Sequence, residues 1–68
     1  MAKFRTNQEL LNYLRGQRAI VAVSRQMGET DGFLSRALGS DPAAVPSVEF
    51  VQRVMDALDT VTNGAPSA

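Results

Sequence analysis

Apolar residues recur three and four positions apart along most of this chain, a spacing that places them on one face of an α-helix. The first stripe comprises Leu10, Leu11 and Leu14. Thr6 and Glu9 stand at the spacing of a capping box, in which each side chain accepts a backbone N–H at the start of a helix. Gly16 suits a helix end, because glycine readily takes the left-handed conformation found there. We therefore expect a first helix from about Thr6 to Gly16.

A second segment runs from about Arg18 to Met27, with Ile20, Val23 and Met27 on one helical face. Its β-branched residues would also suit a strand. We favour a helix because no other segment has the pattern of a strand with which it would pair. Gly28 is expected to end this helix.

Two further helices follow. The third is expected after Thr30, a good N-cap residue. Its apolar residues are Phe33, Leu34, Ala37 and Leu38. Gly39 ends it and begins a loop, rich in glycine, proline and aspartate, that extends to Pro46. Ser47 is expected to cap a fourth helix that runs to about Val61. No strand is predicted, so the expected fold is all-α, a compact domain of four to five helices.

The apolar stripe of the fourth helix covers nearly half of its circumference, which is wider than one core contact requires. One interpretation is a last helix seated deeply in the core. The other is that one edge packs inside while the second edge contacts another subunit, which predicts a homodimer. The expected interface residues are Val48, Val51, Met55 and Val61. Residues 62–68 are predicted to form a disordered tail, so the domain is expected to span residues 1–61.

Composition limits what a chain of 68 residues can do. A domain of this size buries only about 60% of its unfolded surface, so its core is marginal without a partner. The chain has no cysteine and no histidine, which excludes disulfides, thiolate metal sites and an imidazole base. No apolar run approaches the roughly 18 residues of a membrane span. We expect a soluble, cytoplasmic protein with no cofactor and no metal.

An enzyme is not expected. The carboxylate pair Asp56 and Asp59 lies on the polar face of the fourth helix, without the apolar surroundings that a catalytic carboxylate needs.

The net charge is zero, but the charges are unevenly distributed. Six basic and three acidic residues precede Ala37, whereas one basic and four acidic residues follow from there. One interpretation is that the first half of the chain attracts an anion, and the other is that the imbalance is ordinary scatter on a small surface.

The stretch from Arg18 to Leu38 has the spacing of a helix-turn-helix. Gly28 provides the sharp turn. Ser24, four residues earlier, is small enough for two helices to approach closely. Leu34, six residues after the glycine, locks the second helix onto the first. Such a pair presents its later helix as a ridge that enters the DNA major groove.

With these residues the chain resembles the lambda-repressor/Cro-type helix-turn-helix family, and most of all its short addiction-module antidote-like or phage regulators. The resemblance covers about Arg18 to Leu58. It is strongest in the run Leu34-Ser35-Arg36-Ala37-Leu38, in the helix start Pro46-Ser47 and in the closing Met55-Asp56-Ala57-Leu58. It implies a small transcriptional regulator, a repressor that binds double-stranded DNA at specific sequences.

The resemblance also implies which residues contact DNA. The recognition helix would be Thr30 to Leu38, with Leu34 and Leu38 packed inward. The residues implied to face DNA are Thr30, Asp31, Gly32, Ser35 and Arg36, together with Arg18 and Arg25 as phosphate contacts. Arg36 is the best candidate for a base contact, because a guanidinium binds guanine at two points for roughly 1–3 kcal/mol of discrimination. A homodimer would place two recognition helices about 34 Å apart on an inverted-repeat site.

Several residues depart from the family pattern and leave a second function open. The family usually has alanine at the position of Ser24, an apolar residue at Glu29, a polar or basic residue at Asp31 and a capping serine at Val21. Two carboxylates at the front of a recognition helix repel phosphate. Phe33 either folds back into the core or is an exposed anchor for a protein partner. The alternative is a phage-type protein-binding inhibitor or antitoxin that uses Glu29, Asp31 and Phe33 and binds little DNA.

Overall fold

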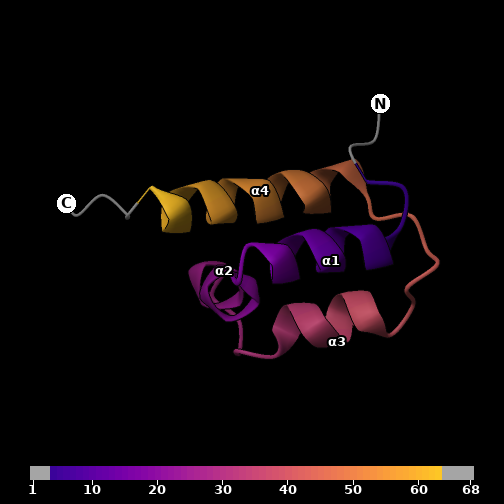
Figure 1. Ribbon diagram of the computed structural model, residues 1–68, viewed down its shortest axis with the longest axis horizontal. Helices are drawn as coiled ribbons and strands as arrows, with labels where there is room; N and C mark the ends of the chain where they lie inside the picture. Colours follow the sequence, from indigo (N-terminus) through magenta and orange to yellow (C-terminus); the bar gives the residue numbers. More distant parts are fainter. Residues whose placement is uncertain (1–3, 64–68) are drawn as a thin grey trace.

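The structure is a computed structural model that describes residues 4–63 and contains four helices in that range: α1 (Asn7–Gly16), α2 (Ile20–Gln26), α3 (Phe33–Gly39) and α4 (Val48–Thr62). No strand occurs among these residues, which confirms the expected all-α class for this part of the chain. In Figure 1, α3 and α4 lie on opposite sides of α1, and α2 is seen almost along its axis. α1 packs on α3, whereas α2 packs on α4, α3 and α1.

A single apolar core joins the four helices. Its buried members are Phe4, Leu10, Leu11, Leu14, Ala19, Val23, Leu34, Leu38, Val54, Ala57 and Leu58. The leucine stripe predicted for the first helix is therefore buried as expected. Leu34 and Leu38 are the residues of α3 in this core. Because burial of one leucine side chain stabilises a fold by about 1.5–3 kcal/mol, these two residues fix α3 against α1 and α2.

The start of α1 is capped nearly as the sequence predicts. The hydroxyl of Thr6 accepts a hydrogen bond from the backbone N–H of Glu9 at 3.2 Å. The carboxylate of Glu9 accepts from the backbone N–H of Arg5 at 3.1 Å, one residue before the N–H that a capping box uses. Thr6 therefore caps the helix as predicted, and the glutamate side chain extends the cap toward the N-terminus.

The loop between α3 and α4 is tied to the start of α1. The backbone N–H of Asn7 donates to the carbonyl of Ala44 at 2.8 Å, and that of Gln8 donates to the carbonyl of Pro42 at 3.1 Å. The amide of the Asn7 side chain donates to the carbonyl of Asp41 at 3.0 Å. Unpaired amides at a helix start need such acceptors, so the loop caps α1 and fixes the C-terminal end of α3 beside it.

The end of α1 differs from the prediction in one respect. The helix ends at Gly16 as expected, but the residue with the left-handed backbone is Arg18, whose φ is 55°. The N–H of Arg18 donates to the carbonyl of Arg15, and the N–H of Ala19 donates to that of Leu14. This hydrogen-bond pair is a Schellman motif, in which glycine usually holds the left-handed position. Arginine holds it here, two residues later than the glycine that the sequence suggested.

The last helix begins as predicted and extends slightly further. The hydroxyl of Ser47 accepts from the backbone N–H of Phe50 at 3.1 Å. The helix continues to Thr62, and Asn63 is its C-cap. These two residues were expected in the disordered tail, and they extend and cap the helix because the i, i+4 backbone bonding continues as far as Asn63. Residues 64–68 of the predicted tail lie outside the described residues.

Candidate nucleic-acid interface

The turn between α2 and α3 is closed by a second Schellman motif, centred on Gly28. Its φ is 82°. The N–H of Gly28 donates to the carbonyl of Arg25 at 2.9 Å, and the N–H of Glu29 donates to that of Ser24 at 3.0 Å. A side chain at this φ would be strained, so the glycine that the sequence identified as the turn residue is confirmed in that position.

The start of α3 differs from the expectation. Thr30 was predicted as its N-cap, but the N-cap is Gly32, which has no side chain to accept a hydrogen bond, and the helix begins at Phe33. Thr30 lies outside the helix, and its carbonyl accepts the N–H of Phe33 at 3.0 Å. The hydroxyl of Thr30 instead accepts a hydrogen bond from Arg36 at 2.9 Å. The Thr30 hydroxyl, which was predicted to cap α3, therefore binds the side chain of Arg36 instead.

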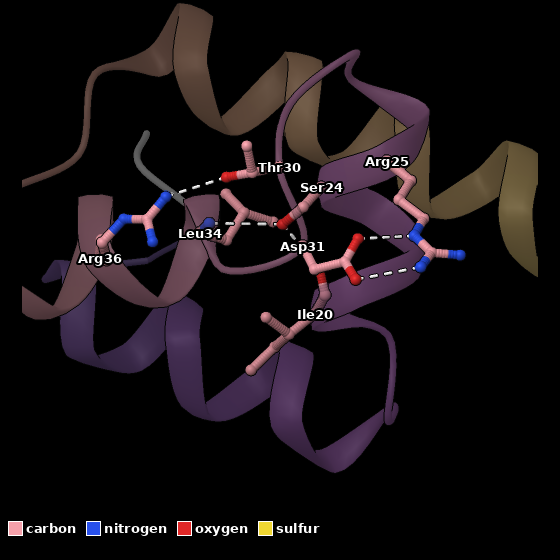
Figure 2. Close-up of polar contacts among 7 residues, drawn as sticks. All are labelled: Ile20, Ser24, Arg25, Thr30, Asp31, Leu34 and Arg36. Atoms are coloured by element: carbon pink, nitrogen blue, oxygen red, sulfur yellow. Dashed lines mark hydrogen bonds and ion pairs between the residues drawn. The ribbon is translucent and has the colours of Figure 1, made fainter.

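Ser24 of α2 supplies the missing cap. Its side chain is fully buried. The hydroxyl donates to the carbonyl of Ile20 at 2.8 Å and accepts from the backbone N–H of Leu34 at 3.3 Å (Figure 2). The hydroxyl therefore acts as both a donor and an acceptor. Ser24 stands where the family that the sequence resembles usually has alanine, and its hydroxyl joins α2 to α3.

α3 presents one face to the body and the other to solvent. Leu34 and Leu38 are buried, whereas Ser35 and Arg36 are exposed. On a helix of 3.6 residues per turn, Arg36 lies opposite the Leu34–Leu38 stripe. Ala37, counted among the apolar residues of this helix, is exposed as well, because at about 100° per residue it lies well to one side of the Leu34–Leu38 stripe.

Asp31 is held in an ion pair rather than left as a single negative charge. Its Oδ1 accepts from Nε of Arg25 at 2.6 Å, and its Oδ2 accepts from Nη2 at 3.0 Å (Figure 2). Both side chains are more than half exposed, at 68% for Arg25 and 55% for Asp31. The side-chain hydrogen bond is the largest cause that lowers the pKa of Asp31 and raises the pKa of Arg25. The repulsion between this carboxylate and phosphate, which the sequence suggested, is therefore offset by a cation at contact distance.

The Arg36 side chain folds back along the outer face of α3 toward the turn. Its Nη2 donates to the Thr30 hydroxyl, and its Nη1 lies 3.3 Å from the point that a Cβ at Gly32 would occupy. The absence of a side chain at Gly32 leaves room for the guanidinium. Thr30 therefore holds the Arg36 guanidinium by a hydrogen bond, and Gly32 leaves space for it.

Five of the seven predicted DNA-facing residues lie together around the turn and the start of α3: Arg25, Thr30, Asp31, Gly32 and Arg36. Ser35 is exposed on α3 beside them. Arg18 is not part of this group. It is exposed in the connection between α1 and α2, at the other end of α2 from Arg25. α2 has seven residues and is therefore about 10 Å long. This length separates Arg18 from the group around the turn.

The three residues of the alternative protein-binding patch do not form an apolar anchor. Glu29 and Asp31 are exposed. Phe33 is partly buried and packs against the core. An anchor of the kind that dominates protein interfaces presents its aromatic ring to the partner, so Phe33 follows the first of its two predicted roles.

The residues predicted for a dimer interface lie along α4 and differ in how much of each side chain is exposed to solvent. Val48 is 68% exposed. Val51 and Met55 are partly buried and pack against the core, and Val61 is partly buried. The inner side of the helix is formed by Val54, Ala57 and Leu58. The wide apolar stripe therefore has one buried edge and one that is open to solvent in this single chain.

Within residues 4–63, no helix combines the length and the apolar character that crossing a bilayer requires. Comparison of the chain with protein-family models, with curated proteins and with solved structures finds no match.

Proposed function

We propose that this protein is a small helix-turn-helix regulator that binds double-stranded DNA through α3 and the preceding turn. The observation that supports this most directly is the placement of Arg36. It lies on the solvent-exposed face of α3, opposite the buried Leu34 and Leu38. An exposed arginine on a short helix at the edge of the molecule has access to base edges in a major groove.

The charges around α3 support the same function. Arg25 and Arg36 are exposed beside the turn, and Asp31, which lies between them in the sequence, is paired with Arg25. Phosphate contacts by arginine orient a protein on the duplex, whereas base contacts specify the sequence. We assign Arg25 to phosphate and Arg36 to a guanine, with Ser35 beside it on the same helix.

Homodimerisation through α4 would complete the recognition unit. Two copies of α3 spaced about 34 Å apart read half-sites one helical turn apart, which is the arrangement that suits an inverted repeat. Occupation of a promoter by such a dimer would exclude polymerase, so the proposed regulatory outcome is repression.

The test is selection of binding sites from a library of random duplexes, followed by titration of the enriched duplex at several salt concentrations. We expect an enriched inverted repeat and an affinity that falls as salt rises, because neutralised phosphates release counterions. Arg36→Ala is expected to cost about 1–3 kcal/mol of discrimination at one base pair of each half-site. Arg53→Ala removes an exposed arginine from α4 and is the matched control.

Two outcomes would contradict the proposal. The first is a library that yields no enriched sequence with the folded wild-type protein, which would favour the protein-binding alternative. The second is an Arg36→Ala variant that discriminates as well as Arg53→Ala does, which would place the recognition surface elsewhere.

A further inference from the structure

Two adjacent residues in the turn hold two arginines that come from different helices. Asp31 accepts two hydrogen bonds from Arg25 of α2, six residues earlier. Thr30 accepts one from Arg36 of α3, six residues later. Figure 2 shows the two guanidinium groups reaching the turn from opposite sides. The turn therefore fixes both cations of the proposed DNA surface.

We propose that Asp31 is a positioning residue for DNA binding, which orients Arg25 so that its remaining N–H groups meet a phosphate. This inference rests on the proposed function. The guanidinium is planar and has five N–H donors in a fixed fork. Asp31 takes one on Nε and one on Nη2. The donors on Nη1 and the second donor on Nη2 remain for a phosphate oxygen.

The positioning has an entropic basis. A free arginine side chain on a protein surface samples many rotamers, and binding must select one of them. A two-point contact with a carboxylate fixes both the plane and the direction of the guanidinium before DNA arrives. The exposure of the pair leaves the outer edge of the guanidinium in solvent, so the contact with Asp31 does not block access to a phosphate.

Charge alone predicts the opposite effect for this residue. If Asp31 acted only through its charge, its removal would increase affinity, because a carboxylate repels phosphate. If Asp31 acts by holding Arg25, its removal decreases affinity even though the protein becomes more positive. The sign of the change in affinity therefore separates the two roles.

The experiment compares four proteins on the duplex selected with the wild type: wild type, Asp31→Asn, Arg25→Ala and the double variant. We expect Asp31→Asn to bind roughly twofold to tenfold more weakly, the factor that corresponds to ordering one long side chain. Arg25→Ala is expected to reduce the salt dependence of log K by about 0.9, the loss of one phosphate contact. In the Arg25→Ala background, Asp31→Asn is expected to increase affinity, since only repulsion remains there.

Glu29→Gln provides the matched control. It removes the same charge from an exposed residue two positions away and is expected to increase affinity slightly. Because Asp31 is exposed and outside the helices, thermal melting should confirm that Asp31→Asn is folded.

The outcomes distinguish this inference from the function on which it rests. If the wild type binds the selected duplex but Asp31→Asn binds it more tightly, as Glu29→Gln does, the positioning role is wrong. The DNA-binding function is not contradicted by that outcome. Wild-type protein that selects no duplex would overturn the DNA-binding function and this inference with it. An Asp31→Asn effect of the same sign and size in the Arg25→Ala background would show that Asp31 does not act through Arg25.

Discussion

The buried hydroxyl of Ser24 in α2 accepts a hydrogen bond from the backbone N–H of Leu34 in α3 at 3.3 Å. The N-cap of α3, Gly32, has no side chain. Ser24, on the neighbouring helix, therefore accepts the backbone N–H that the residue directly before a helix usually caps. The same hydroxyl donates to the carbonyl of Ile20. The start of the proposed recognition helix is therefore fixed to the middle of the helix before it.

Replacing Ser24 by alanine is expected to destabilise the protein although alanine favours helices. The substitution leaves the N–H of Leu34 buried without this acceptor, and loss of an N-cap hydroxyl costs about 1 kcal/mol. Urea denaturation of Ser24→Ala and wild type, analysed with a common m-value, measures this difference.

Ser35→Ala is the control for this prediction, because Ser35 lies in the solvent-exposed part of α3. Its effect is expected to stay within about 0.5 kcal/mol. If Ser24→Ala proves as stable as Ser35→Ala, the hydrogen bond across the two helices contributes nothing to the fold.

Arg18 is the one described residue other than glycine with a positive φ, at 55°. Left-handed backbone costs an L-residue roughly 1–2 kcal/mol, whereas glycine accepts it. Arg18→Gly is therefore expected to be more stable than Arg18→Ala by about 1 kcal/mol, as measured by thermal or urea unfolding. Both variants remove the same charge, so the difference between them isolates the backbone.

The same pair of variants also tests the predicted phosphate contact of Arg18. If its guanidinium binds phosphate, Arg18→Gly and Arg18→Ala weaken DNA binding alike while their stabilities differ. Unfolding curves that coincide for the two variants would contradict the strained conformation at this position.

The residues that the sequence predicted well are those whose roles are local. Thr6 and Ser47 cap the helices that follow them, and Gly28 provides the left-handed turn. Each of these functions depends only on a residue type and on backbone atoms within a few positions. The leucine stripe of α1 is similarly local in its period, and all three of its members are buried.

The features that the sequence missed depend on contacts between segments. Arg18 holds a left-handed position that lets the N–H of the buried Ala19 donate to the carbonyl of Leu14. Nothing in the residue type indicates this. Thr30 is a good N-cap by type, but the helix begins at Phe33, and the amide of Leu34 is bound by Ser24 of another helix. The pairing of Arg25 with Asp31 required the turn geometry, since six residues separate them.

The ion pair between Arg25 and Asp31 predicts a definite titration behaviour. Its side-chain hydrogen bonds lower the pKa of Asp31. A carboxyl with a lowered folded-state pKa contributes stability above its unfolded value, here the ordinary 3.8, and that stability is lost as pH falls through the folded value. Because the pair is exposed, we expect a small loss of stability that sets in as the pH falls toward the ordinary value of 3.8 and is complete only below the lowered pKa of the folded state.

NMR titration of the Asp31 side-chain carboxyl carbon measures this pKa directly. In Arg25→Ala it is expected to return toward the ordinary value, and in Arg25→Lys to recover only in part, because a lysine keeps the charge without the two-point fork. An Asp31 pKa that is the same in wild type and in Arg25→Ala would show that the ion pair is not populated in solution.

The open edge of α4 predicts the oligomeric state. Val48 is 68% exposed near the start of the helix, and the partly buried Val51 and Met55 continue the same edge. A domain of this size has a marginal core, so covering this edge with a second copy would add apolar burial that one chain lacks. Sedimentation equilibrium should give a mass near twice that of the chain, with a monomer fraction that grows on dilution.

Val48→Glu is expected to shift this equilibrium toward the monomer, since it would place a charge in an apolar interface without a partner. The variant should remain folded because Val48 does not belong to the buried core. Arg53→Glu introduces the same residue on the opposite side of α4 and is expected to leave dimerisation nearly unchanged. Equal dissociation constants for Val48→Glu and Arg53→Glu would place the interface away from this edge, and a wild-type monomer at high micromolar concentration would exclude the dimer itself.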